Sequence, residues 1–350
     1  MGDNSKASGS PTGLTKYSFS QNRARYSILQ YLQARTREAA AELPSDFQTL
    51  EEWEGFKESF LPRLKRLLGF PEHRSPMKSE VLDRRQINQY IRERVDFLYD
   101  RGRYVPCFVV RPLNRVERRL PAVVISPGWP QTKWTNSFNH IAERWVDAGF
   151  ITLIPDHPPF GETADSAMPN NMINLMNTCM ALGIPYEGIR GYELIRAVDY
   201  LVTRGDVDPE RICLTGLCQG SIDLWFSAAF EPRFKAIAPV CGTTTFEAWA
   251  LEYINYANLG DASPCVPSIL KVCDVQHIYA SWAPRPVLVQ NNVNDNWWPM
   301  SGYDKVVALA RKVYRLYGVP ERFEAELGNE VHDITPRFEK RILNFFQKWV

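Results

Sequence analysis

The stretch RICLTGLCQGS, residues 211–221, decides the fold of this chain. Its first six residues read as a buried strand, and a helical pattern begins at Gly220. Between them stands G-L-C-Q-G, the G-x-S-x-G pattern of a tight strand-to-helix turn with cysteine in place of serine. Glycine on either side of the central residue lets strand and helix approach closely, because it has no Cβ. We therefore expect Cys218 to be a nucleophile on a strained turn, at a helix N-terminus whose dipole favours a thiolate.

Short apolar strands alternate with helical patterns on both sides of this turn. Such alternation is typical of parallel βαβ units whose helices cover both faces of the sheet. We therefore expect the α/β class with a mostly parallel central sheet. The predicted strands cover residues 91–100, 104–113, 121–126, 150–156, 211–216, 235–241, 284–292 and 322–327, and the predicted helices cover 136–149, 188–204, 303–317, 336–350 and the segment from 220.

The chain divides into three predicted parts. Residues 1–18 are rich in Ser, Gly, Lys and Thr and are expected to be unstructured. Residues 19–85 carry two amphipathic helical patterns and are interpreted as a helical cap on the core, which runs over 86–350. Two stretches of that core break the alternation, at about 163–186 and 244–280, and inserts of this size are expected over the binding face.

Composition excludes several classes of protein. The 41 basic and 40 acidic residues leave a net charge of +1, so nothing favours nucleic acid or an anionic membrane as partner. No run approaches the roughly 18 apolar residues of a membrane span, and the polar N-terminus lacks a signal-peptide pattern. The seven cysteines include no CxxC pair, which argues against a disulfide scaffold and a zinc site. We expect a cytoplasmic protein without metal or cofactor.

A cysteine nucleophile needs a base, and the positions of the histidines favour one of them. His332 follows the predicted strand 322–327 and precedes the last helix, so it is expected at the same sheet edge as Cys218. His157, which follows the strand 150–156, is the alternative base. The other three histidines lie in a polar link, a helix and the second insert.

The base in turn needs a carboxylate that orients it and stabilises the imidazolium. Asp295 lies just past the strand 284–292, which gives the order nucleophile, acid, base along the chain. None of the competing acids follows a strand so directly; they are Asp274, Glu330 and Asp333.

Negative charge that develops on an attacked carbonyl oxygen needs hydrogen-bond donors. The first expected donor is the backbone N–H of Gln219. The second is expected from the loop after strand 121–126, where Pro127 and Pro130 have no N–H, which leaves Gly128 or Trp129. We favour Trp129.

Aromatic side chains are expected to wall the pocket. The four tryptophans near the predicted carboxyl edge suit a planar or apolar acyl group or a sugar ring, and His157 is expected to line the same site. Arg190 and Glu193, on the helix before the turn, are interpreted as a structural ion pair. The predicted substrate-contacting tryptophans are Trp129, Trp134, Trp297 and Trp298.

In these residues the chain resembles α/β-hydrolases of the acetyl xylan esterase and dienelactone hydrolase type. The resemblance covers about residues 85–350 and implies the α/β-hydrolase fold. It rests on three stretches: GYELIRAVDYLVTRGDVDPERICLTGLCQGS (191–221), AIAPVCGTTTFEAW (236–249) and WAPRPVLVQNNVNDNWWP (282–299).

Matched position by position, the resemblance places the nucleophile on Cys218, the acid on Asp295, the base on His332 and the second oxyanion donor on Trp129. This chain departs from the esterase-like members at the nucleophile, which is usually Ser. It departs also at Pro127-Gly128, where His-Gly is usual, and at Ser221, where Gly or Ala is usual.

These residues predict a hydrolase of a carboxylic ester, lactone or thioester that works through an acyl-thioester intermediate. An acyltransferase or cyclase with the same three residues shares the first step and stays an alternative. A non-catalytic binding module on the same fold is the second alternative. The expected partner is a small acyl substrate, and the sequence is compatible with a homo-oligomer.

Overall fold

The structure is a computed structural model that describes residues 27–114, 118–164, 172–252, 266–295 and 297–350. The predicted unstructured segment 1–18 lies outside the described residues. So do residues 165–171 of the first predicted insert and 253–265 of the second.

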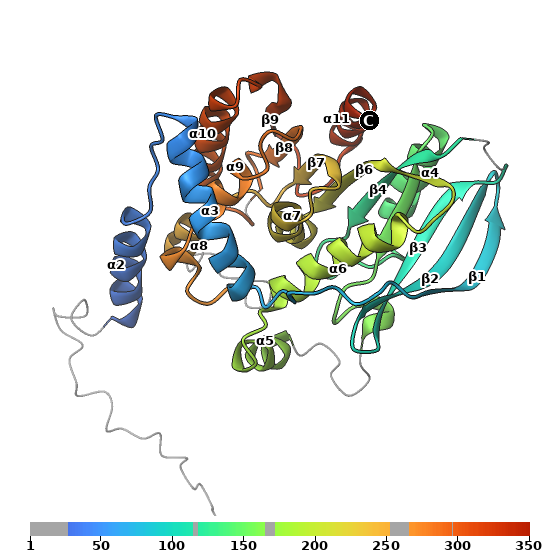
Figure 1. The fold of residues 1–350 in the computed structure, drawn as a ribbon, viewed down its shortest axis with the longest axis horizontal. Coiled ribbons are helices and arrows are strands. Elements are labelled where there is room, and N and C mark those ends of the chain that lie inside the picture. The colour runs from blue at the N-terminus through green and yellow to red at the C-terminus, as the bar shows by residue number, and fades with distance from the viewer. Residues whose placement is uncertain (1–26, 115–117, 165–171, 253–265, 296) are drawn as a thin grey trace, which may run out of the picture.

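One nine-stranded sheet organises the chain, in the order β1-β2-β3-β5-β4-β6-β7-β8-β9 (Figure 1). The pairs from β1 to β5 along this order are antiparallel, and the pairs from β5 to β9 are parallel. The carboxyl ends of β4 to β9 therefore meet at one edge. The strands are β1 Ser79–Ile87, β2 Tyr90–Asp100, β3 Arg103–Pro112, β4 Leu120–Ser126, β5 Ile151–Pro155, β6 Val207–Leu217, β7 Phe234–Val240, β8 Val287–Asn292 and β9 Phe323–Gly328.

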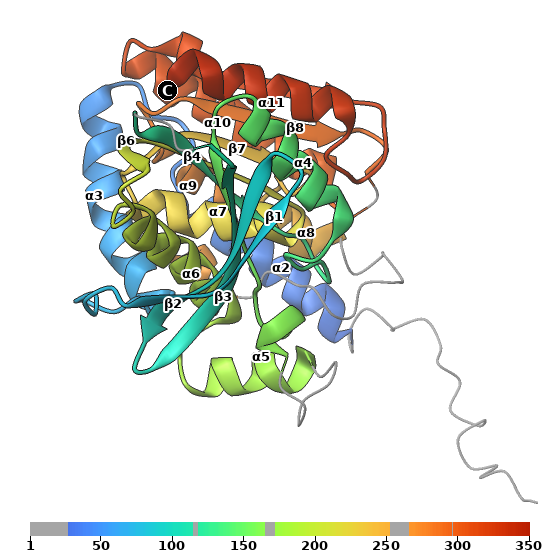
Figure 2. The same ribbon diagram turned by 90° about the vertical axis from the view of Figure 1, so that its right-hand side faces the viewer.

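Helices cover both faces of the sheet (Figures 1 and 2). On one face α6 and α7 contact each other and strands β4 and β6, while α4 packs on β3 and β5 and α11 packs on β7 and β8. The helices are α2 Ile28–Ala41, α3 Leu50–Leu67, α4 Asn136–Asp147, α5 Met172–Ala181, α6 Tyr186–Leu201, α7 Gln219–Phe230, α8 Phe246–Glu252, α9 Val275–Ala280, α10 Met300–Leu316 and α11 Pro336–Trp349, with short 3₁₀ turns at Gly161–Thr163, Ile269–Lys271 and Pro320–Arg322.

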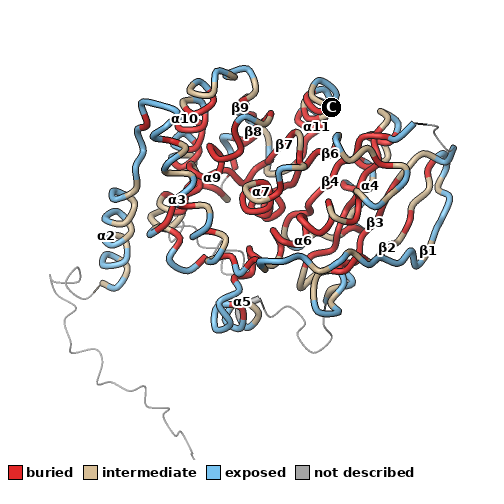
Figure 3. Tube along the Cα trace, viewed as in Figure 1, coloured by how far each residue is buried: buried red, intermediate tan, exposed pale blue. Residues whose placement is uncertain are grey.

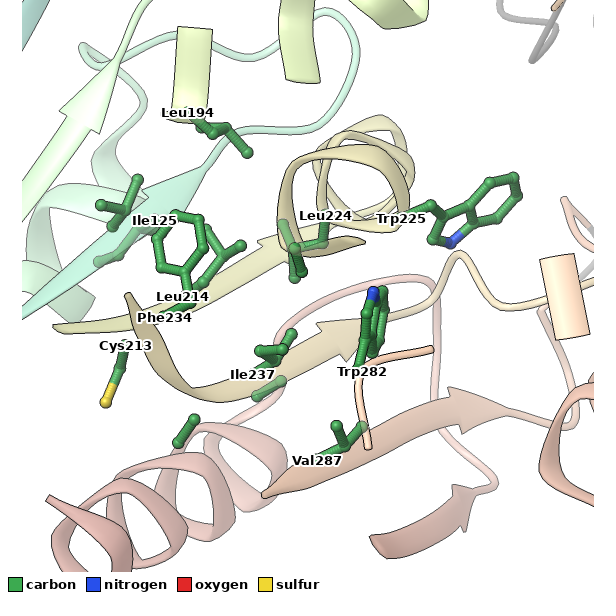
Figure 4. Close-up of a cluster of buried hydrophobic side chains, with 14 of the residues drawn as sticks. Ile125, Leu194, Cys213, Leu214, Leu224, Trp225, Phe234, Ile237, Trp282 and Val287 are labelled. Atoms are coloured by element: carbon green, nitrogen blue, oxygen red, sulfur yellow. The ribbon is translucent and has the colours of Figure 1, made fainter. Parts of the chain in front are cut away.

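The core lies between the central strands and these helices. All residues of β4, β5 and β8 are buried, as expected for strands covered on both faces (Figure 3). Figure 4 shows Leu214 of β6 beside Leu224 of α7. This packing fixes the strand-to-helix turn between β6 and α7 against its neighbours.

Strand β1 was not predicted from the sequence. It begins at Ser79, inside the segment 19–85 that was interpreted as helical, so the sheet starts earlier than the predicted boundary. Its sequence, SEVLDRRQI, is polar and almost wholly exposed because β1 is an edge strand. An edge strand needs no apolar alternation, which removes the signal that sequence patterns rely on.

The two predicted N-terminal helices are present as α2 and α3. Thr49 and Glu52 form a reciprocal cap at the start of α3, which buries Trp53, Phe60 and Leu64 against the rest of the chain. Helix α2 buries no residue fully. Figure 1 shows both helices at the opposite end of the molecule from β1.

The second predicted insert supplies α8 and α9, which pack on α10 and, for α9, on α7. No described helix combines the length and the apolar character that crossing a bilayer requires.

Candidate active site

Cys218 stands at the turn between β6 and α7, with φ 58° and ψ −118°. This left-handed φ is unfavourable for a residue with a side chain, so the surrounding contacts must hold the turn in place. The Cys218 N–H donates to the carbonyl of Val240 at 3.0 Å, which ties the turn to β7. The residue is the N-cap of α7 and is 9% exposed. The sulfur therefore lies at a helix N-terminus and at the carboxyl edge of the sheet.

The glycines around Cys218 have the steric role that the sequence predicted. A Cβ on Gly220 would lie 2.1 Å from the carbonyl oxygen of Ser126, and one on Gly216 would lie 2.7 Å from the backbone of Gly220. A Cβ on Gly128 would lie 3.1 Å from the Cβ of Cys218. The loop after β4 is thus packed directly against the turn that carries the sulfur.

This close packing makes a testable prediction for Gly220→Ala. The added methyl group would clash with the Ser126 backbone, so we expect a loss of about 1–3 kcal/mol in the free energy of unfolding. The matched control is Gly205→Ala, because a Cβ at Gly205 meets nothing within 4 Å. Urea unfolding of both variants is the measurement. Equal stability of the two variants would contradict this account of the turn.

The structure brings His332 and Asp295 together. Asp295 follows β8 and His332 follows β9, and Nδ1 of His332 lies 2.7 Å from Oδ2 of Asp295. The second carboxylate oxygen, Oδ1, accepts a hydrogen bond of 3.0 Å from the N–H of Trp297. Both oxygens of this buried carboxylate are therefore engaged, which fixes the orientation of the imidazole.

Cys218 interacts with the same imidazole. Burial by itself lowers the pKa of His332, but the interactions with Asp295 and Cys218 outweigh burial and raise that pKa to about 10. The Nε2 atom of His332 is buried and makes no hydrogen bond of regular geometry within the described residues. The imidazole is thus held by Asp295 on one nitrogen, and its interactions with Asp295 and Cys218 both favour its protonated form.

The competing acids have other partners. Asp274 is the N-cap of α9, and its carboxylate accepts from the N–H groups of Phe246 and Val275 at 2.7 and 2.6 Å. Glu330 accepts from the hydroxyl of Thr335 at 2.6 Å. Asp333 accepts from the next backbone N–H, at Ile334. Of the four carboxylates considered from the sequence, Asp295 is the one hydrogen-bonded to His332.

The donor candidates for an oxyanion flank Cys218. Gln219 is the first residue of α7. In the loop after β4, the N–H of Gly128 donates to Oε1 of Gln131 at 3.2 Å, so it is already engaged. Because prolines 127 and 130 have no N–H and that of Gly128 is engaged, Trp129 stays the candidate donor of this loop.

The four predicted pocket tryptophans have different environments. Trp297 lies beside the base, with its ring centroid 5.7 Å from that of His332. Trp129 is half-buried and meets the ring of Phe160 edge-on at 5.8 Å. Trp298 is only 4% exposed and belongs to the core, which differs from the predicted pocket wall.

Trp134 is placed away from the turn. It is 50% exposed and packs edge-on against Phe108 of β3, with 4.5 Å between the ring centroids. Strands β5 and β4 lie between β3 and the strand that carries Cys218. This arrangement does not bring Trp134 to Cys218 as the sequence argument expected.

His157 is part of a buried polar cluster. It is 2% exposed, its Nε2 lies 3.0 Å from the hydroxyl of Ser126, and its Nδ1 pairs with Glu193. Glu193 also pairs with Arg103. This environment separates His157 from Asp295 and leaves it little surface for a ligand.

The sequence analysis paired Arg190 with Glu193, and the structure gives each of them another partner. Arg190 binds Asp223 with two hydrogen bonds, Nε to Oδ1 at 2.8 Å and Nη2 to Oδ2 at 2.7 Å. Both residues of the predicted pair are buried and ionically paired, so the structural role holds. Arg190 and Glu193 lie one turn apart on α6, which suggested the pair. The partner of Arg190 is instead Asp223 of α7, and Glu193 pairs with Arg103 of β3.

Sequence reasoning missed Cys241 and Asn292. The Sγ of Cys241, a carboxylate oxygen of Asp295 and a ring nitrogen of His332 lie within 4.8 Å of one another, a group of atom types that can bind a metal ion. Asn292 donates to the carbonyl of Val331 at 2.6 Å and so holds the loop that carries His332. Cys241 follows β7 and Asn292 ends β8, both at the carboxyl edge, which is the signal that could have found them.

Comparison with known proteins gives the fold a name. Residues 105–261 match the family model described as "Dienelactone hydrolase family". The solved structure of a "putative acetyl xylan esterase" from Bacteroides fragilis NCTC 9343 superposes with a TM-score of 0.71 at 18% identity, over 88% of this chain and 83% of the other. This chain has the α/β-hydrolase fold.

Two further likenesses cover most of this chain. The curated relative "Putative hydrolase YtaP" of Bacillus subtilis (strain 168) is 25% identical over 301 residues, which is 82% of this chain and 98% of the relative. A glucuronoyl esterase from Solibacter usitatus superposes with a TM-score of 0.60 at 16% identity, over 88% of this chain and 95% of the other.

Proposed function

We propose that this protein hydrolyses a carboxylic ester, lactone or thioester through Cys218, His332 and Asp295. The observation that carries the proposal is the arrangement at the carboxyl edge of the sheet. A cysteine on a strained turn interacts with an imidazole whose other nitrogen is hydrogen-bonded to a buried carboxylate. Nucleophile, base and orienting acid in this relation are the arrangement that nucleophilic acyl transfer requires.

In the proposed reaction the Cys218 sulfur attacks the acyl carbon. The negative charge then moves to the carbonyl oxygen, which accepts hydrogen bonds from the N–H groups of Gln219 and Trp129. When the carbon–oxygen bond to the leaving group breaks, the imidazolium of His332 protonates the departing oxygen. An acyl-thioester on Cys218 and a neutral imidazole remain.

Hydrolysis completes the cycle with the same groups. His332 takes a proton from water as the water attacks the thioester carbonyl, and the sulfur leaves with the imidazole again protonated. Asp295 stabilises the imidazolium in both half-reactions. A sulfur leaving group departs more readily than an amine, so esters and thioesters are expected as substrates rather than amides.

The family match and the neighbouring structures support the ester class for this chain. A panel of p-nitrophenyl esters, an aryl lactone, an acyl thioester and a p-nitroanilide tests it. We expect turnover of oxygen esters and thioesters and much slower cleavage of the anilide. A panel without turnover and without any acylated enzyme would contradict the proposal.

An amine or thiol acceptor added to the same assay separates hydrolysis from acyl transfer. Under the proposal the acceptor leaves the rate of acyl release unchanged, because water resolves the thioester. Faster release with a conjugated product would instead assign the chain to the acyltransferase alternative.

A further inference from the structure

Arg190 of α6 is buried beneath the loop that carries the proposed second oxyanion donor. Its Nη2 donates to the carbonyl oxygen of Pro127 at 3.0 Å and to Oδ2 of Asp223 at 2.7 Å. Its Nε donates to the other oxygen of Asp223 at 2.8 Å, and the side chain is 1% exposed. The guanidinium therefore bridges two separate elements inside the protein.

One of these elements is the loop after β4. The peptide unit between Pro127 and Gly128 is planar, and it is held at both ends: its oxygen by Arg190 and its N–H by Gln131 Oε1. The next peptide unit carries the N–H of Trp129. Because the planar unit is fixed and a Cβ on Gly128 would lie 3.1 Å from that of Cys218, the direction of this donor relative to the sulfur is set here.

The other element is α7. Asp223 lies on this helix, whose first residue, Gln219, offers the other proposed donor. Ser126 strengthens the bridge, since its hydroxyl donates to Oδ2 of Asp223 at 2.7 Å and lies 3.0 Å from Nε2 of His157. One guanidinium thus connects the helix that carries the first donor to the loop that carries the second.

We propose that Arg190 is a positioning residue that fixes the separation of the Gln219 and Trp129 donors through its bonds to Asp223 and to the Pro127 carbonyl. The inference rests on the proposed function, because it concerns the hydrogen bonds that stabilise the oxyanion. It assigns Arg190 no contact with the substrate.

Arg190→Lys tests this role because a lysine keeps the charge but has no planar fork, so it cannot hold both oxygens of Asp223 as Nε and Nη2 do while also reaching the Pro127 carbonyl. The matched control is Arg196→Lys, on the same helix. Arg196 is equally buried and also bridges an acid, Asp199, and a backbone carbonyl, that of Leu98, but at a place remote from Pro127. Any general cost of replacing a buried arginine on α6 appears in both variants.

The rates of ester hydrolysis and of Cys218 alkylation distinguish displaced oxyanion donors from a less reactive nucleophile. Hydrolysis of a p-nitrophenyl ester passes through an oxyanion, whereas alkylation of Cys218 by iodoacetamide displaces iodide from a saturated carbon and forms none. For Arg190→Lys we expect kcat to fall about 10- to 100-fold with KM within about 3-fold, since losing one donor outright costs about 10²- to 10³-fold. We expect the alkylation rate to stay within about 2-fold of the wild type, and Arg196→Lys to keep kcat within about 3-fold.

Equal losses of kcat in the two lysine variants would overturn the inference, as would a loss of alkylation that parallels the loss of kcat. Should Arg190→Lys fail to fold, Ser126→Ala removes one bond to Asp223 with a smaller change. It is expected to lower kcat several-fold with alkylation unchanged, and unchanged kcat would overturn the inference. Turnover retained by Cys218→Ala would instead refute the proposed function, so the two failures are distinguishable.

Discussion

Cys218→Ala is expected to lower kcat for ester hydrolysis by about 10⁴- to 10⁶-fold, the range seen when the nucleophile is removed from a set of catalytic residues that act together. Alanine cannot form the acyl-enzyme, and neither His332 nor the donor N–H groups can replace that bond. The turn requires a left-handed φ at residue 218 but no sulfur, so the alanine variant is expected to fold. Initial rates on p-nitrophenyl esters and a circular dichroism spectrum are the measurements.

The matched control for this variant is Cys213→Ala, which removes a fully buried thiol from β6, the strand that leads into Cys218. It is expected to retain turnover, because its side chain packs in the core (Figure 4). Cys218→Ser is expected to keep some esterase activity with the fold unchanged. Activity of Cys218→Ala near that of Cys213→Ala would remove Cys218 from the mechanism.

His332→Gln is expected to lower kcat by about 10³- to 10⁴-fold, comparable to the loss of a base or its correct tautomer in other triads. The glutamine can neither hold the proton that the leaving group needs nor take the proton of the attacking water. The hydrogen bond between the imidazole and Asp295, which raises the pKa of His332, is also lost. Steady-state kinetics on the same esters measure the effect.

His140→Gln is the control, because the His140 side chain is 65% exposed on α4 and its Nδ1 lies 3.7 Å from a carboxylate oxygen of Glu143. It is expected to leave kcat and KM unchanged. If the two histidine variants behave alike, the base must be sought elsewhere.

The sequence predicts the centre of this fold well and its margins less well. Strands β4 to β8 contain buried apolar runs because helices cover both faces, and these runs are visible in the sequence. β1 escapes prediction because its exposed edge position tolerates SEVLDRRQI. The turn at Cys218 is predictable because its glycines leave no room for a side chain: a Cβ on Gly220 would lie 2.1 Å from the carbonyl oxygen of Ser126.

The candidate site is predictable where a residue follows a strand directly. Asp295 and His332 do so, and the structure places Nδ1 of His332 2.7 Å from Oδ2 of Asp295. The partners of Arg190 could not be predicted, because Asp223 and the Pro127 carbonyl reach it from elements far away in the sequence. Trp298 was expected in the pocket because it lies near the predicted carboxyl edge of the sheet, but its side chain lies in the core, whereas that of the adjacent Trp297 lies beside the imidazole.

The central claim is that Cys218 carries the acyl group, and intact-mass spectrometry during turnover of an activated ester tests it most directly. The account predicts one added acyl mass that maps to the peptide containing Cys218, reverses as hydrolysis proceeds and is absent from Cys218→Ala. Turnover with the acyl group on another residue, or with no acylated enzyme under rapid quench in the presence of excess ester, would contradict it.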